Sequence, residues 1–199
     1  MEKINNVFYI PGMMMDSNSY LIDNVLIDTG TGLAPDYLLE NLKNQGIAPE
    51  DIDTVINTHG HFDHIGGNYL FPNAKIAIGE FDAEIIRAEN HPYSASRMFG
   101  ESIKRHDVDI EFKNGDTIAG FEVIHTPGHT EGGICLYDGE ILISGDTIFS
   151  QGVYGRTDLG GNFEDIKSSI MKLNEYDIKY LLPGHGPWVN HNNKDFFIP

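Results

Sequence analysis

The segment from Thr58 to Gly67 holds a dense group of residues that can bind a metal ion. Three histidines and one aspartate fall within six positions, namely His59, His61, Asp63 and His64. An apolar run at residues 54–57 comes directly before them, and small residues surround them. Imidazole and carboxylate without thiolate suit zinc, iron or manganese rather than a structural cysteine site. We therefore predict a short buried strand that delivers metal ligands to one edge of a sheet.

Three later segments repeat this design, in which an apolar run is followed by a turn of small residues and then a ligand type. The ligand types are His129, Asp146 and His185. Together with the first cluster they give seven candidate donors, whereas one tetrahedral zinc ion takes four. Seven donors fit two metal ions if one carboxylate bridges them, and this leaves room for a water molecule.

The charge of the chain argues against polyanionic partners. Its 199 residues include 30 acidic and 13 basic side chains, so the formal net charge is −17. Nucleic-acid binding needs clustered lysine and arginine, and so does docking on anionic lipid. We expect neither nucleic acid nor membrane as a partner, and a small-molecule substrate instead. The sequence does not indicate an oligomeric state.

The hydrophobic content predicts an ordinary folded protein. Apolar residues make up 40% of the chain, and no run approaches the ~18 apolar residues of a membrane span. The first residues carry no signal-peptide pattern, so we expect a soluble, cytoplasmic protein. The single cysteine, Cys135, lies in an apolar run, which excludes an internal disulfide and predicts a buried thiol.

Apolar runs and turn residues predict many short strands and a few helices. Strands are expected at residues 6–10, 19–23, 25–28, 55–56, 74–78, 110–112, 116–118, 121–125, 134–137, 141–144 and 179–182. Helices are expected at residues 35–45, 68–71, 80–89 and from a cap at Asn162 to Leu173. The pairs Asp23-Asn24, Asn114-Gly115 and Asp138-Gly139 predict hairpins. Two runs of strands, each followed by helix, favour two sheets packed face to face with helices outside.

Two segments fit no regular element. Met13, Met14 and Met15 lie in an expected loop, which either folds back onto the core or forms a flexible apolar flap over a substrate. Residues 90–105 are expected to form an insertion over one face. The cations Arg97, Lys104 and Arg105 of this insertion either meet an anionic substrate tail or lie in solvent.

The pattern Thr58-His59-x-His61-x-Asp63-His64, with His129, Asp146 and His185 after later strands, resembles the metallo-β-lactamase-fold hydrolases over nearly the whole chain. The resemblance implies an α+β fold, a four-layer αββα sandwich, formed by residues 1–199 as one domain. It also implies two divalent metal ions, with Zn2+ as the first expectation and iron or manganese as alternatives. The implied ligands are His59, His61 and His129 for the first metal, and Asp63, His64 and His185 for the second, with Asp146 as the bridge.

Within that superfamily, the segments Gly145–Phe149 and Gly155–Asp158 are similar to those of glyoxalase-II-like proteins, which hydrolyse the thioester hydroxyacyl-glutathione. The chain ends about a dozen residues after His185, so we expect no C-terminal helical substrate domain and a match to the short, single-domain members. The implied reaction is attack of a metal-bound hydroxide on a thioester or related ester, with Asp63 orienting the nucleophile and Asp146 joining the metals. A mononuclear iron persulfide dioxygenase and a lactonase or lactamase of the same fold are the alternatives.

Residues around these motifs receive supporting roles. Asp28, at a strand end, either orients a ligand histidine or caps a turn. Arg156 and Asp158 are predicted to pair and hold the loop after Asp146. Tyr154, in the same loop, is a candidate for substrate contact.

Overall fold

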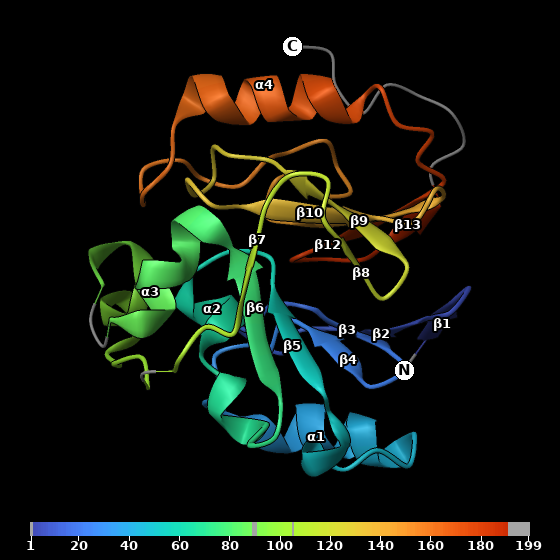
Figure 1. Cartoon of the computed structure of the whole chain (residues 1–199), viewed down its shortest axis with the longest axis vertical. Coiled ribbons are helices and arrows are strands. Elements are labelled where there is room, and N and C mark those ends of the chain that lie inside the picture. Colours follow the sequence, from blue (N-terminus) through green and yellow to red (C-terminus); the bar gives the residue numbers. More distant parts are fainter. Residues whose placement is uncertain (1, 89–90, 105, 191–199) are drawn as a thin grey trace.

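A computed structural model of the protein describes residues 2–88, 91–104 and 106–190, and within these ranges the strands form two sheets (Figure 1). The first sheet has the order β1-β2-β3-β4-β5-β6-β7, antiparallel from β1 to β4 and parallel from β4 to β7. Its strands are β1 (Glu2–Ile4), β2 (Val7–Ile10), β3 (Ser19–Ile22), β4 (Val25–Ile27), β5 (Thr54–Asn57), β6 (Lys75–Gly79) and β7 (Ile110–Phe112).

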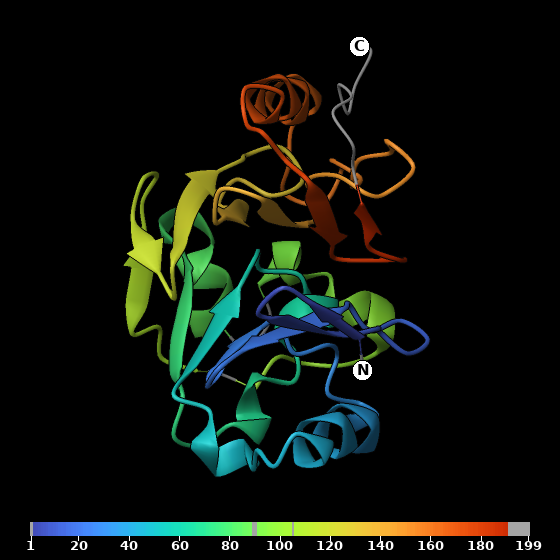
Figure 2. The same ribbon diagram turned by 90° about the vertical axis from the view of Figure 1, so that its right-hand side faces the viewer.

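The second sheet has the order β13-β12-β11-β10-β9-β8, and only the β11–β12 pair is parallel. Its strands are β8 (Thr117–Ile118), β9 (Phe121–His125), β10 (Ile134–Tyr137), β11 (Ile141–Gly145), β12 (Tyr180–Pro183) and β13 (Val189–Asn190). The helix α1 (Pro35–Asn44) lies outside the first sheet, and α4 (Phe163–Leu173) lies outside the second (Figures 1 and 2).

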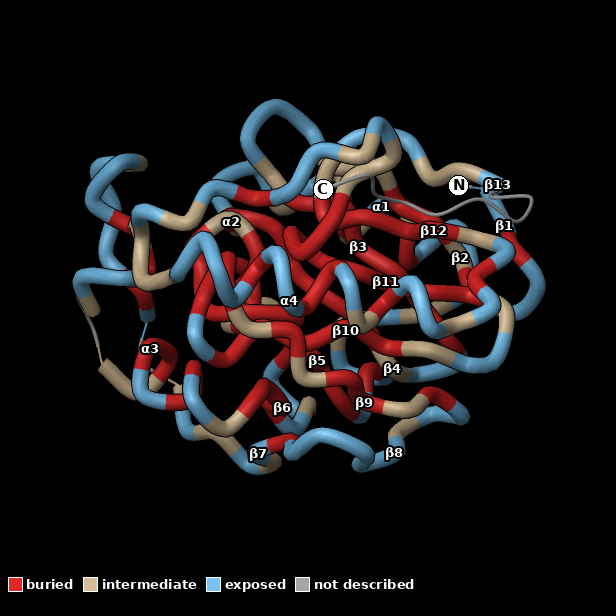
Figure 3. Tube along the Cα trace, turned by 90° about the horizontal axis from the view of Figure 1, so that it is seen from above, coloured by how far each residue is buried: buried red, intermediate tan, exposed pale blue. Residues whose placement is uncertain are grey.

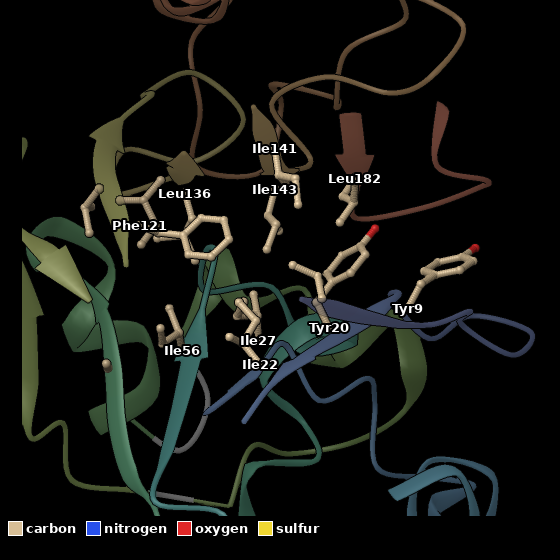
Figure 4. Close-up of a cluster of buried hydrophobic side chains, with 14 of the residues drawn as sticks. Tyr9, Tyr20, Ile22, Ile27, Ile56, Phe121, Leu136, Ile141, Ile143 and Leu182 are labelled. Atoms are coloured by element: carbon tan, nitrogen blue, oxygen red, sulfur yellow. The ribbon is translucent and has the colours of Figure 1, made fainter. Parts of the chain in front are cut away.

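Alternating side chains of the strands separate the layers. In the second sheet, Val123 and Leu136 face the first sheet, whereas their neighbours Ile124 and Cys135 pack under α4. Figure 4 shows the cluster between the sheets, where Tyr20 and Ile56 meet Phe121 and Leu182. A further cluster joins the first sheet to α1, so that buried residues run through the molecule and exposed ones cover it (Figure 3). This arrangement confirms the predicted αββα sandwich.

The ends of the main helices follow the sequence signals. Pro35 opens α1, and Gly46, just beyond its end, takes a positive φ of 77°. The side chain of Asn162 caps α4 by accepting hydrogen bonds from the backbone N–H groups of Glu164 and Asp165. The hairpins predicted at Asp23-Asn24 and Asp138-Gly139 are present, joining β3 to β4 and β10 to β11.

The hairpin predicted at Asn114-Gly115 is wrong. The strands on either side, β7 and β8, belong to different sheets, so this turn carries the chain from one layer to the other. The hairpin lies instead at Ala119-Gly120, which joins β8 to β9 and takes φ values of 50° and 84°. Positive φ at both central residues suits the right-handed twist of two hairpin strands.

Other elements differ from the prediction at their bounds. The helix predicted at residues 80–89 is divided into a 3-10 turn, Glu80–Asp82, and α3 (Ala83–Arg87), and residues 89 and 90 lie outside the described ranges. The helix predicted at residues 68–71 is a 3-10 turn, Asn68–Leu70. The strand predicted at residues 179–182 is not the last, because the edge strand β13 follows it, and β1 precedes the first predicted strand. Cys135 is buried as predicted, which raises the pKa of its thiol to about 11.

The predicted insertion contains two 3-10 turns, Pro92–Ser94 and Ser96–Phe99, while its ends at Asn90 and Arg105 lie outside the described residues. The ring of Phe99 packs 5.2 Å from that of Phe62, in the short helix α2 (Phe62–Ile65) that follows β5. The insertion therefore lies beside the first metal-ligand motif. Among the described residues, no helix has both the length and the apolar character of a membrane span.

Candidate metal centre

The seven residues predicted as metal ligands lie together at one edge of the two sheets. Asp63 and His64 are on α2, and His59 and His61 lie in the turn between β5 and α2. His129, Asp146 and His185 follow β9, β11 and β12 of the second sheet. Both sheets therefore contribute, and the residues form three overlapping groups that could hold a metal ion: His59–His61–His129, His59–His64–Asp146 and Asp63–His64–His185.

The first group brings three imidazole nitrogens to a common point. His59 Nε2 lies 3.1 Å from His61 Nδ1 and 3.1 Å from His129 Nε2, and the last two are 2.8 Å apart. Nitrogens bound tetrahedrally to one zinc ion at ~2.0–2.1 Å would be about 3.3 Å from each other. The spacing of this group is thus close to that of a metal's ligands.

Backbone carbonyls determine which nitrogen of each ring carries the proton. His61 Nε2 lies 3.1 Å from the carbonyl oxygen of Leu159, and His129 Nδ1 lies 2.6 Å from that of Arg156. A carbonyl oxygen can only accept, so these ring nitrogens donate and the nitrogens facing the centre are left unprotonated. Three lone pairs at ~3 Å repel one another, and a cation between them removes the repulsion.

Burial keeps these rings neutral. It lowers the pKa of His129 to about 4, although Asp146 opposes the effect. Burial, reinforced by the neighbouring histidines, places the pKa of His59 well below its usual value, and burial also lowers the pKa of His61. Neutral imidazole is the form that binds a metal.

The group of Asp63, His64 and His185 is more open to solvent than the group of three histidines. His185 Nε2 lies 3.1 Å from Asp63 Oδ2, and the side chains of these two residues are 33% and 20% exposed. His64 is fully buried, with Nδ1 2.8 Å from Asp28 Oδ2 and Nε2 3.3 Å from Asp146 Oδ1. A substrate that reaches the centre therefore meets the side of Asp63 and His185 first.

Asp146 lies between the His59–His61–His129 group and the Asp63–His64–His185 group. Oδ1 faces His64, whereas Oδ2 lies 3.5 Å from His129 Nε2 and 3.7 Å from His185 Nε2. Burial alone would raise the pKa of Asp146, but these histidines outweigh it and hold the pKa far below its usual value. Asp146 Oδ1 and His64 Nε2 are buried without a hydrogen-bond partner among the described residues. With Nε2 unprotonated, these two atoms face to face fit a bound cation between them.

Asp28 contacts both the ring of His64 and the turn at Thr58, so both roles considered for it, orienting a histidine and capping a turn, are present. Its Oδ2 accepts from His64 Nδ1, and its Oδ1 accepts from the backbone N–H of Thr58 at 2.8 Å. Asp28 and Asp146 raise the pKa of His64 well above its usual value, against the effect of burial. The proton on Nδ1 is thereby fixed, and Nε2 faces the centre.

Two buried polar residues near the centre carried no signal in the sequence. Asp82, at the start of α3, accepts from Gly60 N at 2.9 Å and from Gly132 N at 2.7 Å. It therefore joins the turn of His59 and His61 to the loop after His129. Asn18 donates to the carbonyl oxygens of Pro183 and Gly186, on either side of His185. Their partners are backbone groups far along the chain, which no local motif reveals.

The other residues predicted to support the centre agree with the prediction to different extents. Arg156 and Asp158 form the predicted pair, with two hydrogen bonds of 2.7 and 2.6 Å, on the loop whose carbonyls hold His61 and His129. Tyr154 is 40% exposed, and its ring packs 6.0 Å from that of Phe163. Lys104 lies 3.4 Å above the ring of Tyr69. Arg105 lies outside the described residues.

A model of the metallo-beta-lactamase superfamily matches residues 14–185, and the chain therefore belongs to this superfamily. It is 39% identical to a probable metallo-hydrolase of Methanocaldococcus jannaschii, over 90% of this chain and 92% of that protein. It is 28% identical to the acyl-coenzyme A thioesterase MBLAC2 of Bos taurus, over 81% of this chain and 68% of that one.

Solved structures support the same assignment. The protein TTHA1623, crystallised in a di-iron-bound form, is 28% identical and superposes with a TM-score of 0.77, over 92% of this chain and 94% of that one. The B3 metallo-beta-lactamase BLEG-1 is also 28% identical, with a TM-score of 0.78 over 92% and 93% of the two chains. The chain is thus a metallo-hydrolase of this superfamily with a metal-binding fold.

We expect Asp82→Asn to weaken metal binding by the His59–His61–His129 group. Asparagine has one side-chain oxygen, so either Gly60 N or Gly132 N would face an NH2 group instead of an acceptor, at a cost of about 1–3 kcal/mol. Titration with Zn2+ or Fe2+ followed by calorimetry measures the affinity. Asp109→Asn is the matched control, because Asp109 also accepts a backbone N–H, from Ile76, but away from the histidines. Equal metal affinities in the two variants would contradict this role.

We expect Gly184→Ala to lower the metal content without removing any ligand side chain. A Cβ at this position would lie 2.1 Å from Asp146 Oδ1 and 2.8 Å from His64 Cε1, so these two residues would have to separate. Gly186→Ala in the same loop is the control, since its Cβ would meet nothing within 4 Å although φ is +78°. Metal analysis after reconstitution checks the difference. The same metal content in both variants would show that the contact is tolerated.

Proposed function

We propose that the protein is a metal-dependent hydrolase that cleaves an acyl thioester or a related ester with two bound metal ions. The observation that carries this proposal is the position of Asp146 between the two groups of histidines, with Oδ1 facing His64 and Oδ2 facing both His129 and His185. We assign His59, His61 and His129 to one metal, Asp63, His64 and His185 to the other, and Asp146 to both. Zn2+ and iron both suit this donor set, and the di-iron form of TTHA1623 makes iron a specific candidate.

Bound divalent cations would supply a water of lowered pKa and an electrophile that polarises the carbonyl group. The chain itself supplies a carboxylate at the open side of the centre, Asp63. Burial would raise the pKa of Asp63, but His185 and His64 lower it, so the group is ionised at neutral pH. An ionised carboxylate there can accept a hydrogen bond from the attacking water and orient it towards the carbonyl carbon.

Hydrolysis of a thioester can be written with all bonds and protons accounted for and with no further catalytic group. A C–O bond forms between water and the acyl carbon, the C–S bond breaks, and the proton released by water ends on the thiolate or in solvent. A thiolate is a good leaving group because the pKa of a thiol is ~8.5. This chemistry requires no dedicated general acid, and it suits a centre in which burial lowers the pKa values of His59 and His129.

The relatives support a hydrolase but leave the substrate open. The thioesterase of Bos taurus acts on acyl-coenzyme A by its name, and BLEG-1 is a lactamase. The short glyoxalase-II-like group therefore stays a prediction, as does hydroxyacyl-glutathione as a substrate. The alternative of a mononuclear iron persulfide dioxygenase is less well supported, because a second group of ligand types is complete here.

We expect His59→Ala and Asp146→Ala to abolish hydrolysis of acyl thioesters while the fold persists. His59 belongs to two of the three ligand groups, and Asp146 faces both metals in our assignment. Thiol release from a panel of thioesters, together with far-UV circular dichroism, measures activity and folding. His125→Ala is the control, because His125 is partly exposed and stacks on Phe81. Turnover retained in His59→Ala would refute the assignment.

Metal content and oxygen uptake separate the two reaction classes. Purified protein is analysed for metals, treated with a chelator and reconstituted with Zn2+ or Fe2+. It is then tested on thioesters, lactones, a β-lactam and a persulfide. We expect about two metal ions per chain and hydrolysis that returns with metal. Oxygen consumption on the persulfide with one iron ion per chain would favour the dioxygenase instead.

A further inference from the structure

Large apolar side chains that are exposed to solvent gather around the candidate metal centre. The described residues include eleven such side chains, and nine of them lie in segments that adjoin the centre. We call these nine the apolar rim: Met13, Met14, Met15, Leu33, Tyr93, Met98, Val153, Tyr154 and Phe163. Single exposed apolar residues are ordinary, but a cluster of them marks a binding surface.

The methionine loop is fixed at its base to the open side of the centre. The backbone N–H of Ser17 donates to the carbonyl of Asp63, and that of Asn18 donates to the carbonyl of Gly184. The side chain of Asp16 accepts from Thr31 N, which brings Leu33 to the same place. Met14 is 95% exposed and Met15 63%, so the loop does not fold back onto the core. The exposure argues against a loop that packs on the core, and the flap over a substrate stays a prediction.

A second part of the rim belongs to the loop after β11. The carbonyls of Arg156 and Leu159 in this loop hold His129 and His61. Val153 and Tyr154 come directly before Gly155, whose backbone lies against the ring of His129. Tyr154 in turn contacts Phe163, at the start of α4. These side chains therefore lie on the side of the first metal group.

The insertion supplies the third part. Tyr93 packs directly on Gly160 of the same loop, and Phe99, next to Met98, packs on Phe62 beside His61. The methionine loop, the short helices of residues 92–99 and the loop of residues 150–161 all lie on one side of the molecule (Figure 2, blue, yellow-green and orange). The apolar rim thus flanks both metal groups.

Two of the cations near the rim are engaged in contacts within the chain, whereas Arg97, next to Met98, is exposed. Arg156 makes two hydrogen bonds to Asp158, and Lys104 lies on the ring of Tyr69. The chain as a whole carries a net charge of −17. A substrate bound at this rim therefore gains more from its apolar part than from anionic groups. Unbranched methionine side chains adapt well to a flexible alkyl chain.

We propose that the apolar rim binds the hydrocarbon part of the acyl group, so that the substrate is a thioester or ester of a medium- or long-chain carboxylic acid. The proposal rests on the proposed hydrolase function and adds the class of acyl group. The carbonyl lies at the metal centre, and the alkyl chain extends over the methionine loop.

The test uses S-acyl N-acetylcysteamine thioesters from acetyl to decanoyl, which keep the thiol constant and uncharged. The metal-loaded protein is expected to show a kcat/KM that rises about two- to fourfold per methylene, and therefore at least about 60-fold over the methylenes added from acetyl to octanoyl. The triple variant Met13→Ser, Met14→Ser, Met15→Ser is expected to reduce the octanoyl-to-acetyl ratio about fivefold or more. The double variant Phe81→Ser, Met171→Ser is the matched control, because it removes exposed apolar residues outside the rim.

A measurement without turnover separates this proposal from the hydrolase function. Calorimetry of acetate, hexanoate and decanoate with the same proteins is expected to give tighter binding with chain length, and the methionine variant is expected to lose this trend. If binding tightens with chain length but no thioester or ester is hydrolysed, the proposed hydrolase function is refuted and the proposed role of the apolar rim is supported. An unchanged octanoyl-to-acetyl ratio of kcat/KM in the methionine variant would overturn the proposed binding of the alkyl chain by the apolar rim. It would also be overturned if the variant changed only self-association or vesicle binding.

Discussion

The metal centre depends on hydrogen bonds that fix the protons of its histidines. In three of these histidines the opposite nitrogen of the ring donates to an acceptor, which leaves the inward nitrogen free to act as a ligand. For His61 and His129 these acceptors are the carbonyls of Leu159 and Arg156, and for His64 the acceptor is Asp28. The segment of residues 150–161 therefore helps to orient the candidate ligands His61 and His129, although it contains none of the seven candidate ligands.

The centre also depends on how the two sheets pack. His59, His61, Asp63 and His64 follow β5 in the first sheet, whereas His129, Asp146 and His185 follow strands of the second. The buried cluster between the sheets sets their separation, and specific polar contacts refine it. Asp82 ties Gly60 to Gly132 across the gap, and Tyr20 donates to the carbonyl of Pro183, close to His185. A centre shared by two layers is rigid because neither layer can slide without breaking these contacts.

That the seven candidate ligands lie close together could be predicted from the sequence, because they follow apolar strands and turns of small residues. The layers were also predictable, since period-two burial and helix caps are local signals. The hairpin prediction at Asn114-Gly115 was wrong because the same turn residues suit both a hairpin and a crossing between sheets. Only the long-range pairing of the flanking strands distinguishes these two structures. Asp82 and Asn18 could not be found for a related reason. Their role lies in backbone groups that are up to 168 residues away along the chain.

The candidate metal ligands and the apolar rim lie in different kinds of segment. The candidate ligands lie after strand ends or on a short helix, and most are buried. The apolar rim lies on the methionine loop, the insertion and the loop after β11, where exposure leaves side chains free to adapt. Only the loop after β11 belongs to both, because its carbonyls hold two histidines while Val153 and Tyr154 face solvent. A change of acyl group that displaces this loop would therefore also disturb the rings of His61 and His129, whereas the methionine loop can vary without touching a ligand side chain.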